Sequence, residues 1–357
     1  MVPEPLTSTA DADLVALSSY SVRAGSTRVR LYDWFAHLGL RAEAQCYAGL
    51  PNGRPGTLAR HLPQVLAAER RLRRLDLTGR RVILSRSASP LSRGGIERRL
   101  LGQSAHAVFD FDDAIHLVVN WRDRVADATA KFETCVRAAD VVIAGNDLLA
   151  EVAADLHDNV VMIPSCIEPD DYLVKTDWSL DAPARLVWIG SMATERYLLP
   201  VLPALDRLHR ELGVELKVIS TGRPNPGFGN RDWIRYVPWT PASAASELNA
   251  ADLAIAPLSD TPFARGKCAY KVLQYAATGL PIAGSPVGAN SLALERFGGL
   301  SVAADWYRPL RSLIEATASE RARLGVRAAD TVRKHYSFAA WAGQWRAALD
   351  LPILDAR

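Results

Sequence analysis

The chain has 357 residues, of which 49% are hydrophobic and 23% charged, and its net charge is +3. At about 150 residues per domain this length predicts two globular domains, and the composition excludes a disordered or fibrous protein. Four cysteines without a CxxC pair give no indication of a disulfide scaffold or of a thiolate zinc site, and so small a net charge gives no indication of nucleic-acid binding.

The first 20 residues begin acidic and lack the basic and apolar stretches of a signal peptide, and no apolar run is long enough to span a bilayer. We therefore expect a cytoplasmic protein. Residues 41–99 carry 13 arginines against 4 acidic residues. An ordinary solvated surface is the simpler explanation of this charge, and the functional alternative is peripheral contact of the basic segment 69–99 with the inner face of the membrane.

Short apolar runs alternate with longer helical patterns along the whole chain, which predicts parallel strands joined by crossover helices. In the first half the predicted strands are 13–19, 42–49, 81–87, 106–112, 140–146 and 159–165, and the predicted helices are 26–39, 57–75, 128–139 and 147–157. Asp147 is the expected N-cap of the last of these helices. A polar loop at 167–184 interrupts the pattern and is interpreted as a linker.

The alternation resumes after this loop. The predicted strands are 185–191, 216–222, 234–239, 253–259, 280–286 and 299–304, and the predicted helices are 197–212, 241–250, 268–278, 291–297 and 307–323. A last helix within 337–352 has apolar residues at helical spacing, including two tryptophans that suggest docking against another domain. The pattern predicts an α/β protein with two doubly wound sheets, whose ligands bind at the carboxyl ends of the strands.

Several phosphate-binding and catalytic motifs are absent from the sequence. No GxGxxG follows the first strand, which argues against a nicotinamide or flavin enzyme. The segment around Arg265-Gly266-Lys267 lacks the first glycine and the Ser or Thr of a Walker loop. Neither GxSxG nor HExxH occurs, so hydrolase and zinc-protease interpretations have no support.

The most informative segment is 259–290, SDTPFARGKCAYKVLQYAATGLPIAGSPVGAN. It contains the end of a strand, a charged loop, a helix predicted from Cys268 and a turn at Gly279. Lys267 at the helix start and Lys271 one turn later are expected on one helix face, where the positive helix end would help them to bind an anion. A pair of solvated lysines is the alternative explanation.

This segment resembles the donor site of family 4 glycosyltransferases, which have the GT-B fold. The variant RGKCxxKxLQYxAxGLPI is similar to one branch of that family. DVVIAGNDLLAEVA and NVVMIPSCIEPDDY resemble the end of the acceptor domain, and LVWIGSMATERYLLPVLPAL resembles the start of the donor domain. The resemblance implies two Rossmann-like domains facing across a cleft: an acceptor domain (1–178), a donor domain (179–335) and a terminal helix (336–357) that packs back towards the acceptor domain.

The resemblance also implies an activity. The protein is expected to be a retaining glycosyltransferase that moves a sugar from a nucleotide sugar, by default a UDP-sugar, to a saccharide, lipid-linked or natural-product acceptor. It implies neither a cofactor nor a metal, because cations of the protein stabilise the departing diphosphate. The residues expected to act catalytically in this way are Arg265, Lys267 and Arg196.

The sequence departs from the family at the donor site. The family carries two glutamates eight residues apart, and these positions are Gly266 and Gln274 here. Gln274 can still hydrogen-bond a ribose, whereas Gly266 cannot hold a sugar hydroxyl, and Asp260 is the suggested substitute. The implied donor-binding residues are Ser191, Thr194, Lys271, Gln274, Asp260 and Trp239.

The strand 106–112 ends in acidic residues that allow different interpretations. As part of a glycosyltransferase, the implied acceptor-binding residues are Arg23, Ser26, Asp112, Asp113 and His116. Alternatively, Asp110 to Ala114 resembles the first motif of haloacid-dehalogenase phosphatases, with Asp110 as nucleophile and Asp112 as acid–base beside magnesium. The missing first glutamate suggests a third interpretation, a catalytically silent GT-B partner protein.

Overall fold

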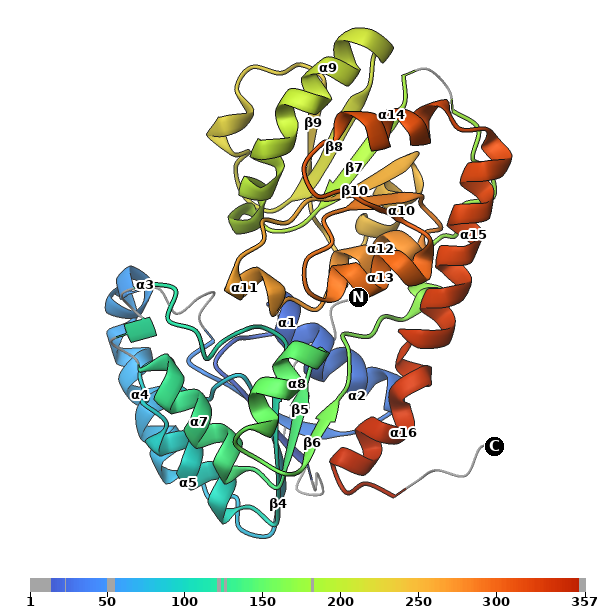
Figure 1. Cartoon of the computed structure of the whole chain (residues 1–357). Helices are drawn as coiled ribbons and strands as arrows, with labels where there is room; N and C mark the ends of the chain where they lie inside the picture. The colour runs from blue at the N-terminus through green and yellow to red at the C-terminus, as the bar shows by residue number, and fades with distance from the viewer. Residues whose placement is uncertain are drawn as a thin grey trace. The chain divides into compact units, whose positions relative to one another are not determined.

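The computed structural model describes residues 14–22, 24–49, 55–120, 123–124, 127–180 and 183–352. The chain forms two compact units (Figure 1). Unit 1 comprises Met1–Cys166, Gly266–Cys268 and Trp341–Arg357, and unit 2 comprises Ile167–Arg265 and Ala269–Ala340. The division therefore falls after Cys166, not at the expected 178, and three residues from the expected donor domain belong to unit 1.

Unit 1 contains a six-stranded parallel sheet in the order β2-β1-β3-β4-β5-β6. Its strands are β1 (Leu14–Ser18), β2 (Ala42–Cys46), β3 (Arg81–Ser85), β4 (His106–Phe111), β5 (Val141–Ala144) and β6 (Val160–Met162). Every residue of β1 is buried, as expected of a strand covered on both faces. Because β1 lies between β2 and β3, the direction in which strands are added reverses there.

The helices of unit 1 are α1 (Gly25–Thr27), the π-helical turn η1 (Arg28–Tyr32), α2 (Asp33–Leu38), α3 (Pro55–Arg60), α4 (Leu62–Arg74), α5 (Gly95–Gln103), α7 (Ala128–Ala138) and α8 (Asp147–Ala154). The expected helix 57–75 is broken at His61, shortly before Pro63. The N-cap of α8 is Asn146 and not Asp147, because the Asn146 side chain accepts from the backbone N–H of Leu149 at 2.9 Å.

The C-terminal helix α16 (Phe338–Ala348) contributes a tryptophan to the core of unit 1. The ring of Trp345 stacks on Trp34 of α2 with centroids 5.2 Å apart and an interplanar angle of 11°. Phe35 meets the same ring edge-on at 6.0 Å. Both tryptophans are fully buried, which accounts for the apolar spacing in the terminal segment.

Unit 2 contains a second six-stranded parallel sheet in the order β12-β11-β10-β7-β8-β9. Its strands are β7 (Arg185–Ile189), β8 (Glu215–Ser220), β9 (Ile234–Pro238), β10 (Leu253–Ala256), β11 (Ile282–Gly284) and β12 (Leu300–Ser301). Val187 and Ile189 belong to one core cluster, whereas Leu186 and Trp188 belong to another. Alternate residues of β7 thus pack on opposite faces of a doubly wound sheet.

The helices of unit 2 are η2 (Pro169–Asp171), η3 (Met192–Val201), α9 (Leu202–Leu212), η4 (Pro226–Phe228), α10 (Ala244–Asn249), α11 (Pro262–Arg265), α12 (Tyr270–Ala277), α13 (Ala289–Phe297), α14 (Tyr307–Glu315) and α15 (Ala318–His335). The expected helix 307–323 is interrupted at Thr317, which forms a capping box with Glu320 and starts α15.

All predicted strands are present, and the α/β doubly wound class is confirmed. Within the described ranges, no helix combines the length and the apolar character needed to cross a membrane.

Replacing Trp345 with Ala should lower the free energy of unfolding of unit 1 by about 3–5 kcal/mol, because the substitution removes a fully buried ring. The neighbouring Gln344 is exposed, and Gln344→Ala should change stability by less than about 0.5 kcal/mol. Urea unfolding followed by far-UV circular dichroism measures both effects, and equal midpoints for the two variants would contradict this view of α16.

Candidate functional site in two parallel sheets

Each sheet has a point where the strand order reverses, and open parallel sheets bind ligands there, beyond the carboxyl ends of the strands. This point lies between β1 and β3 in unit 1 and between β7 and β10 in unit 2. Most of the predicted site residues follow one of these strands or a neighbouring one. Each unit therefore has its own group of candidate residues at the reversal point, which is called its half-site.

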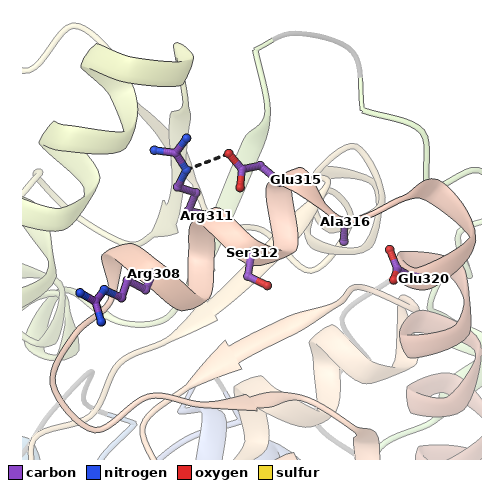
Figure 2. A pocket seen from close by; sticks show the side chains of 6 residues that line it. All are labelled: Arg308, Arg311, Ser312, Glu315, Ala316 and Glu320. Carbon is purple, nitrogen blue, oxygen red and sulfur yellow. Dashed lines mark hydrogen bonds and ion pairs between the residues drawn. The ribbon is translucent and has the colours of Figure 1, made fainter.

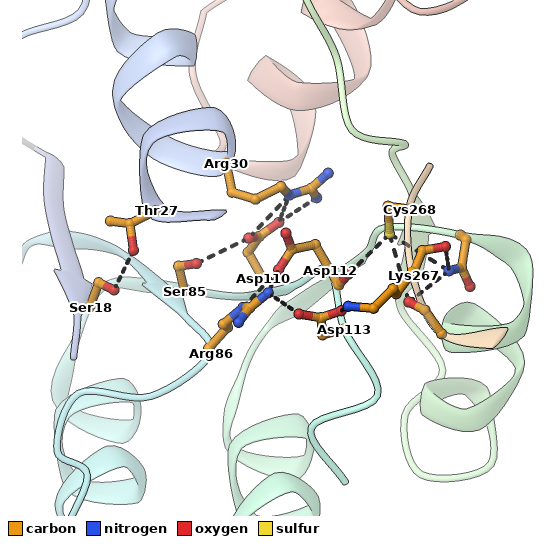
Figure 3. Close-up of polar contacts among 12 residues, drawn as sticks. Ser18, Thr27, Arg30, Ser85, Arg86, Asp110, Asp112, Asp113, Lys267 and Cys268 are labelled. Atoms are coloured by element: carbon orange, nitrogen blue, oxygen red, sulfur yellow. Dashed lines mark hydrogen bonds and ion pairs between the residues drawn. The ribbon is translucent and has the colours of Figure 1, made fainter. Parts of the chain in front are cut away.

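The unit 1 half-site is built on a buried ion pair (Figure 3). The guanidinium of Arg30, in η1, donates to Asp110 at the end of β4, with Nη2 2.5 Å from Oδ1. It also donates to the carbonyl oxygens of Ile163 and Pro164, each at 2.9 Å. Burial alone would lower the pKa of Arg30, but the carboxylate of Asp110 raises this pKa by a larger amount, so the net shift is upward. Arg30 and Asp110 are both fully buried.

This burial bears on the phosphatase alternative. A nucleophilic aspartate must reach a phosphorus atom with a free carboxylate oxygen. Asp110 is instead covered by Arg30 and also accepts a hydrogen bond from the Ser85 hydroxyl at 3.4 Å. The geometry therefore argues against Asp110 as a nucleophile.

Arg86 organises the two carboxylates that follow. It lies just beyond β3 with φ of 62°, an uncommon conformation for a residue other than glycine. Its Nε donates to Asp112 Oδ1 at 2.7 Å, and its Nη2 donates to Asp113 Oδ2 at 2.5 Å. Burial alone would raise the pKa of Asp112, but Arg86 and the nearby Arg30 and Lys267 lower it below its usual value. Asp112 is therefore ionised at neutral pH.

The tripeptide Gly266–Cys268 is part of this half-site. Lys267 Nζ lies 3.4 Å from Asp113 Oδ1, and the Cys268 thiol contacts the carbonyl oxygen of Asp112 at 3.2 Å. Burial raises the pKa of the Cys268 thiol, so it acts as a neutral donor. Asn146 donates to the carbonyl oxygen of Gly266 at 3.0 Å, which ties the tripeptide to the N-terminus of α8.

Close packing explains why position 266 is glycine. A Cβ atom at Gly266 would lie 2.6 Å from the Cβ of Ala114 and 2.9 Å from its backbone nitrogen. No larger residue fits without moving the Asp112–Ala114 turn, so a glutamate is sterically excluded in this arrangement.

The expectation that Lys267 and Lys271 share one helix face is wrong. Helix α12 begins at Tyr270, and Ala269 before it has φ of 54°. Lys267 therefore lies outside the helix, and the carboxylate of Asp113 is its observed partner. The positive helix end and the two lysines do not form a single anion-binding face.

The remaining predicted acceptor residues are less tightly connected. The half-buried His116 ring lies 5.3 Å from the ring of Phe132, and burial lowers the pKa of His116. Ser26 is in α1, next to Thr27, whose hydroxyl contacts that of Ser18 at 3.2 Å. Arg23 lies outside the described residues.

The unit 2 half-site begins with the turn after β7. The backbone of Gly190 packs against the ring of Trp188, and an added Cβ would lie 2.9 Å from Thr194 Oγ1. Ser191 caps η3, and its backbone N–H donates to Thr194 Oγ1 at 3.2 Å. Arg196, on the same helix, is exposed, and its guanidinium lies 5.2 Å from the centre of the Tyr197 ring.

Helix α12 is fixed against this turn. The Tyr275 hydroxyl accepts from the backbone N–H of Ile189 at 2.9 Å and donates to the carbonyl oxygen of Ile255 at 3.2 Å. These bonds join α12 to the ends of β7 and β10. The ammonium of Lys271 lies 4.3 Å from the centre of the Trp188 ring, so Lys271 and the Gly190 turn contact the same tryptophan.

Three predicted donor residues have other partners. Arg265 pairs with Asp260 through bonds of 2.6 and 3.0 Å, and both side chains are more than half exposed. Gln274 is only 7% exposed and donates to the Tyr172 hydroxyl at 3.0 Å. Trp239 is half-buried against a core cluster. These contacts provide no direct support for a ribose-binding role of Gln274 or for a donor-binding role of Trp239.

Sequence reasoning missed Glu195. This fully buried carboxylate accepts from the Ser220 hydroxyl at 2.5 Å, the Tyr236 hydroxyl at 3.2 Å and the backbone N–H of Asn225 at 2.9 Å. Its neighbours in sequence are Thr194 and Arg196, so the local pattern gives no sign of burial.

A groove elsewhere in unit 2 does not belong to either half-site. It has a volume of about 400 Å³ and lies along α14 (Figure 2). Two of its lining residues, Arg311 and Glu315, pair with each other at 2.7 Å, and a third, Glu320, caps α15. In the described part of the chain, no group of three or more His, Cys, Asp or Glu residues could hold a metal ion.

Comparison with solved structures identifies the architecture. Sucrose-phosphate synthase from Thermosynechococcus elongatus aligns with a TM-score of 0.70 at 15% identity, over 94% of this chain and 99% of that one. This is the GT-B fold. Anabaena HepE, solved with UDP and glucose, aligns with a TM-score of 0.65 at 12% identity over 94% and 99%.

A third GT-B structure is similar over the same extent. The UDP-forming trehalose-phosphate synthase from Burkholderia xenovorans aligns with a TM-score of 0.62 at 12% identity, over 95% of this chain and 99% of that one. Neither a protein-family model nor a curated protein matches the sequence. At this level of identity, the similarity shows the GT-B fold of the chain.

The Arg86 ion pairs should make stability depend on pH. An aspartate with a lowered pKa stabilises the fold above its ordinary pKa of about 3.9, and this contribution is lost as the pH falls through the lowered value. Arg86→Met should therefore cost about 3 kcal/mol at pH 7 and progressively less below about pH 4, as the pH falls towards the lowered pKa at which Asp112 is protonated in the folded protein.

Urea unfolding between pH 3 and pH 7 measures this difference. The control is Arg98→Met, since Arg98 is exposed on α5 and its effect should be small at every pH. A cost of Arg86→Met that is constant over this range would show that the charge of Asp112 does not interact with Arg86.

Proposed function

We propose that the protein is a retaining glycosyltransferase of family 4, which transfers a sugar from a nucleotide sugar to a carbohydrate, lipid-linked or natural-product acceptor. The proposal is supported by the GT-B fold, by the sequence resemblance over most of the chain, and by the description of the similar structures as UDP-forming or UDP-bound. A UDP-sugar is the proposed donor. The observation on which the proposal mainly rests is the gathering of cations and hydroxyls at the β7 turn of unit 2.

In this proposal the unit 2 half-site binds the donor. Ser191 and Thr194 present hydroxyls, and Arg196 and Lys271 present charge, at the reversal point where a parallel sheet receives its ligand. The close approach of Gly190 to Trp188 and Thr194 keeps this turn free of a side chain. This leaves space for a diphosphate to lie directly against the turn.

The proposed chemistry is stabilisation of the leaving diphosphate. Cations aimed at developing negative charge accelerate such a step, and loss of one well-placed donor typically costs about 100- to 1000-fold in rate. Arg196 and Lys271 are the main residues proposed to stabilise the leaving diphosphate. Arg265 and Lys267 were predicted with them, but phosphate oxygens would have to replace Asp260 and Asp113 as their partners.

The unit 1 half-site is the proposed acceptor site. Asp113 is 18% exposed and Asp112 is 11% exposed, so each offers limited room for a hydroxyl of an acceptor. His116 is half-buried nearby in sequence, and its lowered pKa keeps it neutral at pH 7. Retention of anomeric configuration and independence from metals remain predictions from the family resemblance.

Membrane contact through segment 69–99 also remains a prediction. Within this segment, helix α4 exposes arginines at 70, 71, 73 and 74, and its Leu62 and Leu66, which precede the segment, are 51% and 47% accessible. Apolar side chains next to arginines are typical of helices that bind anionic lipid surfaces.

The donor class can be tested by thermal shift with UDP, GDP, ADP and dTDP. A ligand that binds only the folded protein raises the melting temperature, and at 100 times Kd it adds about 2.7 kcal/mol to stability. We expect UDP to give the largest shift, and we expect the protein to hydrolyse or transfer the sugar of a UDP-sugar. UDP binding without any turnover would favour a silent GT-B partner, and no shift with any nucleotide would contradict the proposal.

Two lysine variants separate the half-sites. Lys271→Met should reduce turnover of a UDP-sugar by about 100-fold, because Lys271 lies at the donor turn. Lys267→Met should leave the Kd for UDP within about threefold, because Lys267 is paired with Asp113 in unit 1; a factor of three corresponds to less than about 1 kcal/mol. Isothermal titration with UDP and initial rates measure both. If Lys267→Met weakened UDP binding as much as Lys271→Met does, the result would show that Lys267 also contacts the diphosphate.

A further inference from the structure

The loop after β8 is held beside the β7 turn by the buried Glu195. One carboxylate oxygen of Glu195 accepts from the Ser220 hydroxyl at 2.5 Å, at the start of this loop. The other accepts from the backbone N–H of Asn225 at 2.9 Å, at its end. Hydrogen bonds to a buried carboxylate are strong, so both ends of the 220–225 loop are fixed to η3, the helix that carries Arg196.

The middle of the loop turns at Gly222, which has φ of 91°, a conformation that favours glycine. A Cβ added there would lie 3.2 Å from Met192 Sδ, so the loop packs against the first residue of η3. Ser191 and Thr194 belong to the same turn. The next residue, Arg223, is exposed. It directly follows Gly222, which contacts the proposed donor turn.

Among the described residues, no carboxylate balances the charge of Arg223. Within the described ranges Arg223 has no ion-pair partner, whereas Arg265 is paired with Asp260 and Lys267 with Asp113. An arginine without an internal partner can bind an anion without first breaking an ion pair. Its planar guanidinium also suits two oxygens of a phosphate group.

We infer that Arg223 is an additional diphosphate-binding residue of unit 2, and that Glu195 positions the loop that carries it. The inference rests on the proposed function and deepens it. The ligand chemistry is that of a nucleoside diphosphate, whose phosphates would lie against the β7 and β8 turns together.

The test compares the Kd for UDP of Arg223→Ala, Arg223→Lys and the wild-type protein by isothermal titration at fixed salt. We expect Arg223→Ala to weaken UDP binding about tenfold or more, as for loss of a charge-assisted hydrogen bond. Arg223→Lys should recover part of the loss. The matched control is Arg210→Ala, an exposed arginine in the last turn of α9, which should bind UDP as the wild type does.

The positioning role of Glu195 is tested by a double-mutant cycle. Glu195→Gln keeps the side-chain size but removes one of the two acceptor oxygens that hold the loop. It should weaken UDP binding in the wild type and have little further effect when Arg223 is already Ala. Additive losses would show that Glu195 acts elsewhere, and they would overturn its positioning role.

The outcomes distinguish this inference from the proposed function. If the wild type binds UDP and Arg223→Ala binds it equally well, Arg223 is an ordinary solvated arginine and only the inference fails. If the wild type binds none of UDP, GDP, ADP and dTDP, the proposed function and the inference fail together.

Discussion

The ion pair between Arg30 and Asp110 is the constraint on which unit 1 depends. Two opposite charges with no solvent exposure are tolerated in a protein only when each satisfies the other. Through this pair, the first helical segment is tied to the end of β4, and the carbonyl oxygens of Ile163 and Pro164 are tied to the same guanidinium. The Asp112–Ala114 turn begins two residues after Asp110, so its position follows from this arrangement.

Much of the fold could be predicted from the sequence, because buried parallel strands are short apolar runs and the crossover helices separate them. The predictions failed for helices whose first residues are glycines or whose N-terminal cap was not recognised. Helix α5 was not predicted because it starts at Gly94 and Gly95, which are typical of loops. Helix α15 was cut short, although Thr317 and Glu320 form a capping box that could have marked its beginning.

The candidate site was less predictable because it depends on partners that are distant in sequence. Spacing could place Lys267 and Lys271 in one segment, but it could not show that Asp113, 154 positions away, holds Lys267. Nor could it show that Gln274 is buried against Tyr172. The region of a site at the ends of parallel strands can be predicted from the sequence, since the topology brings the turns after these strands to the same edge of the sheet. Which charges remain available for a ligand depends on tertiary packing.

The assignment of Gly266–Cys268 to unit 1 has a consequence for domain exchange. A chimaera that joins residues 1–166 to the second half of another GT-B protein would retain Asp112, Ala114 and Asn146 but receive a foreign tripeptide at their surface. Any side chain at the first of its three positions would collide with Ala114. A chimaera that keeps the N-terminal half of this chain therefore also has to keep its own Gly266–Cys268 segment, because the glycine packs against Ala114.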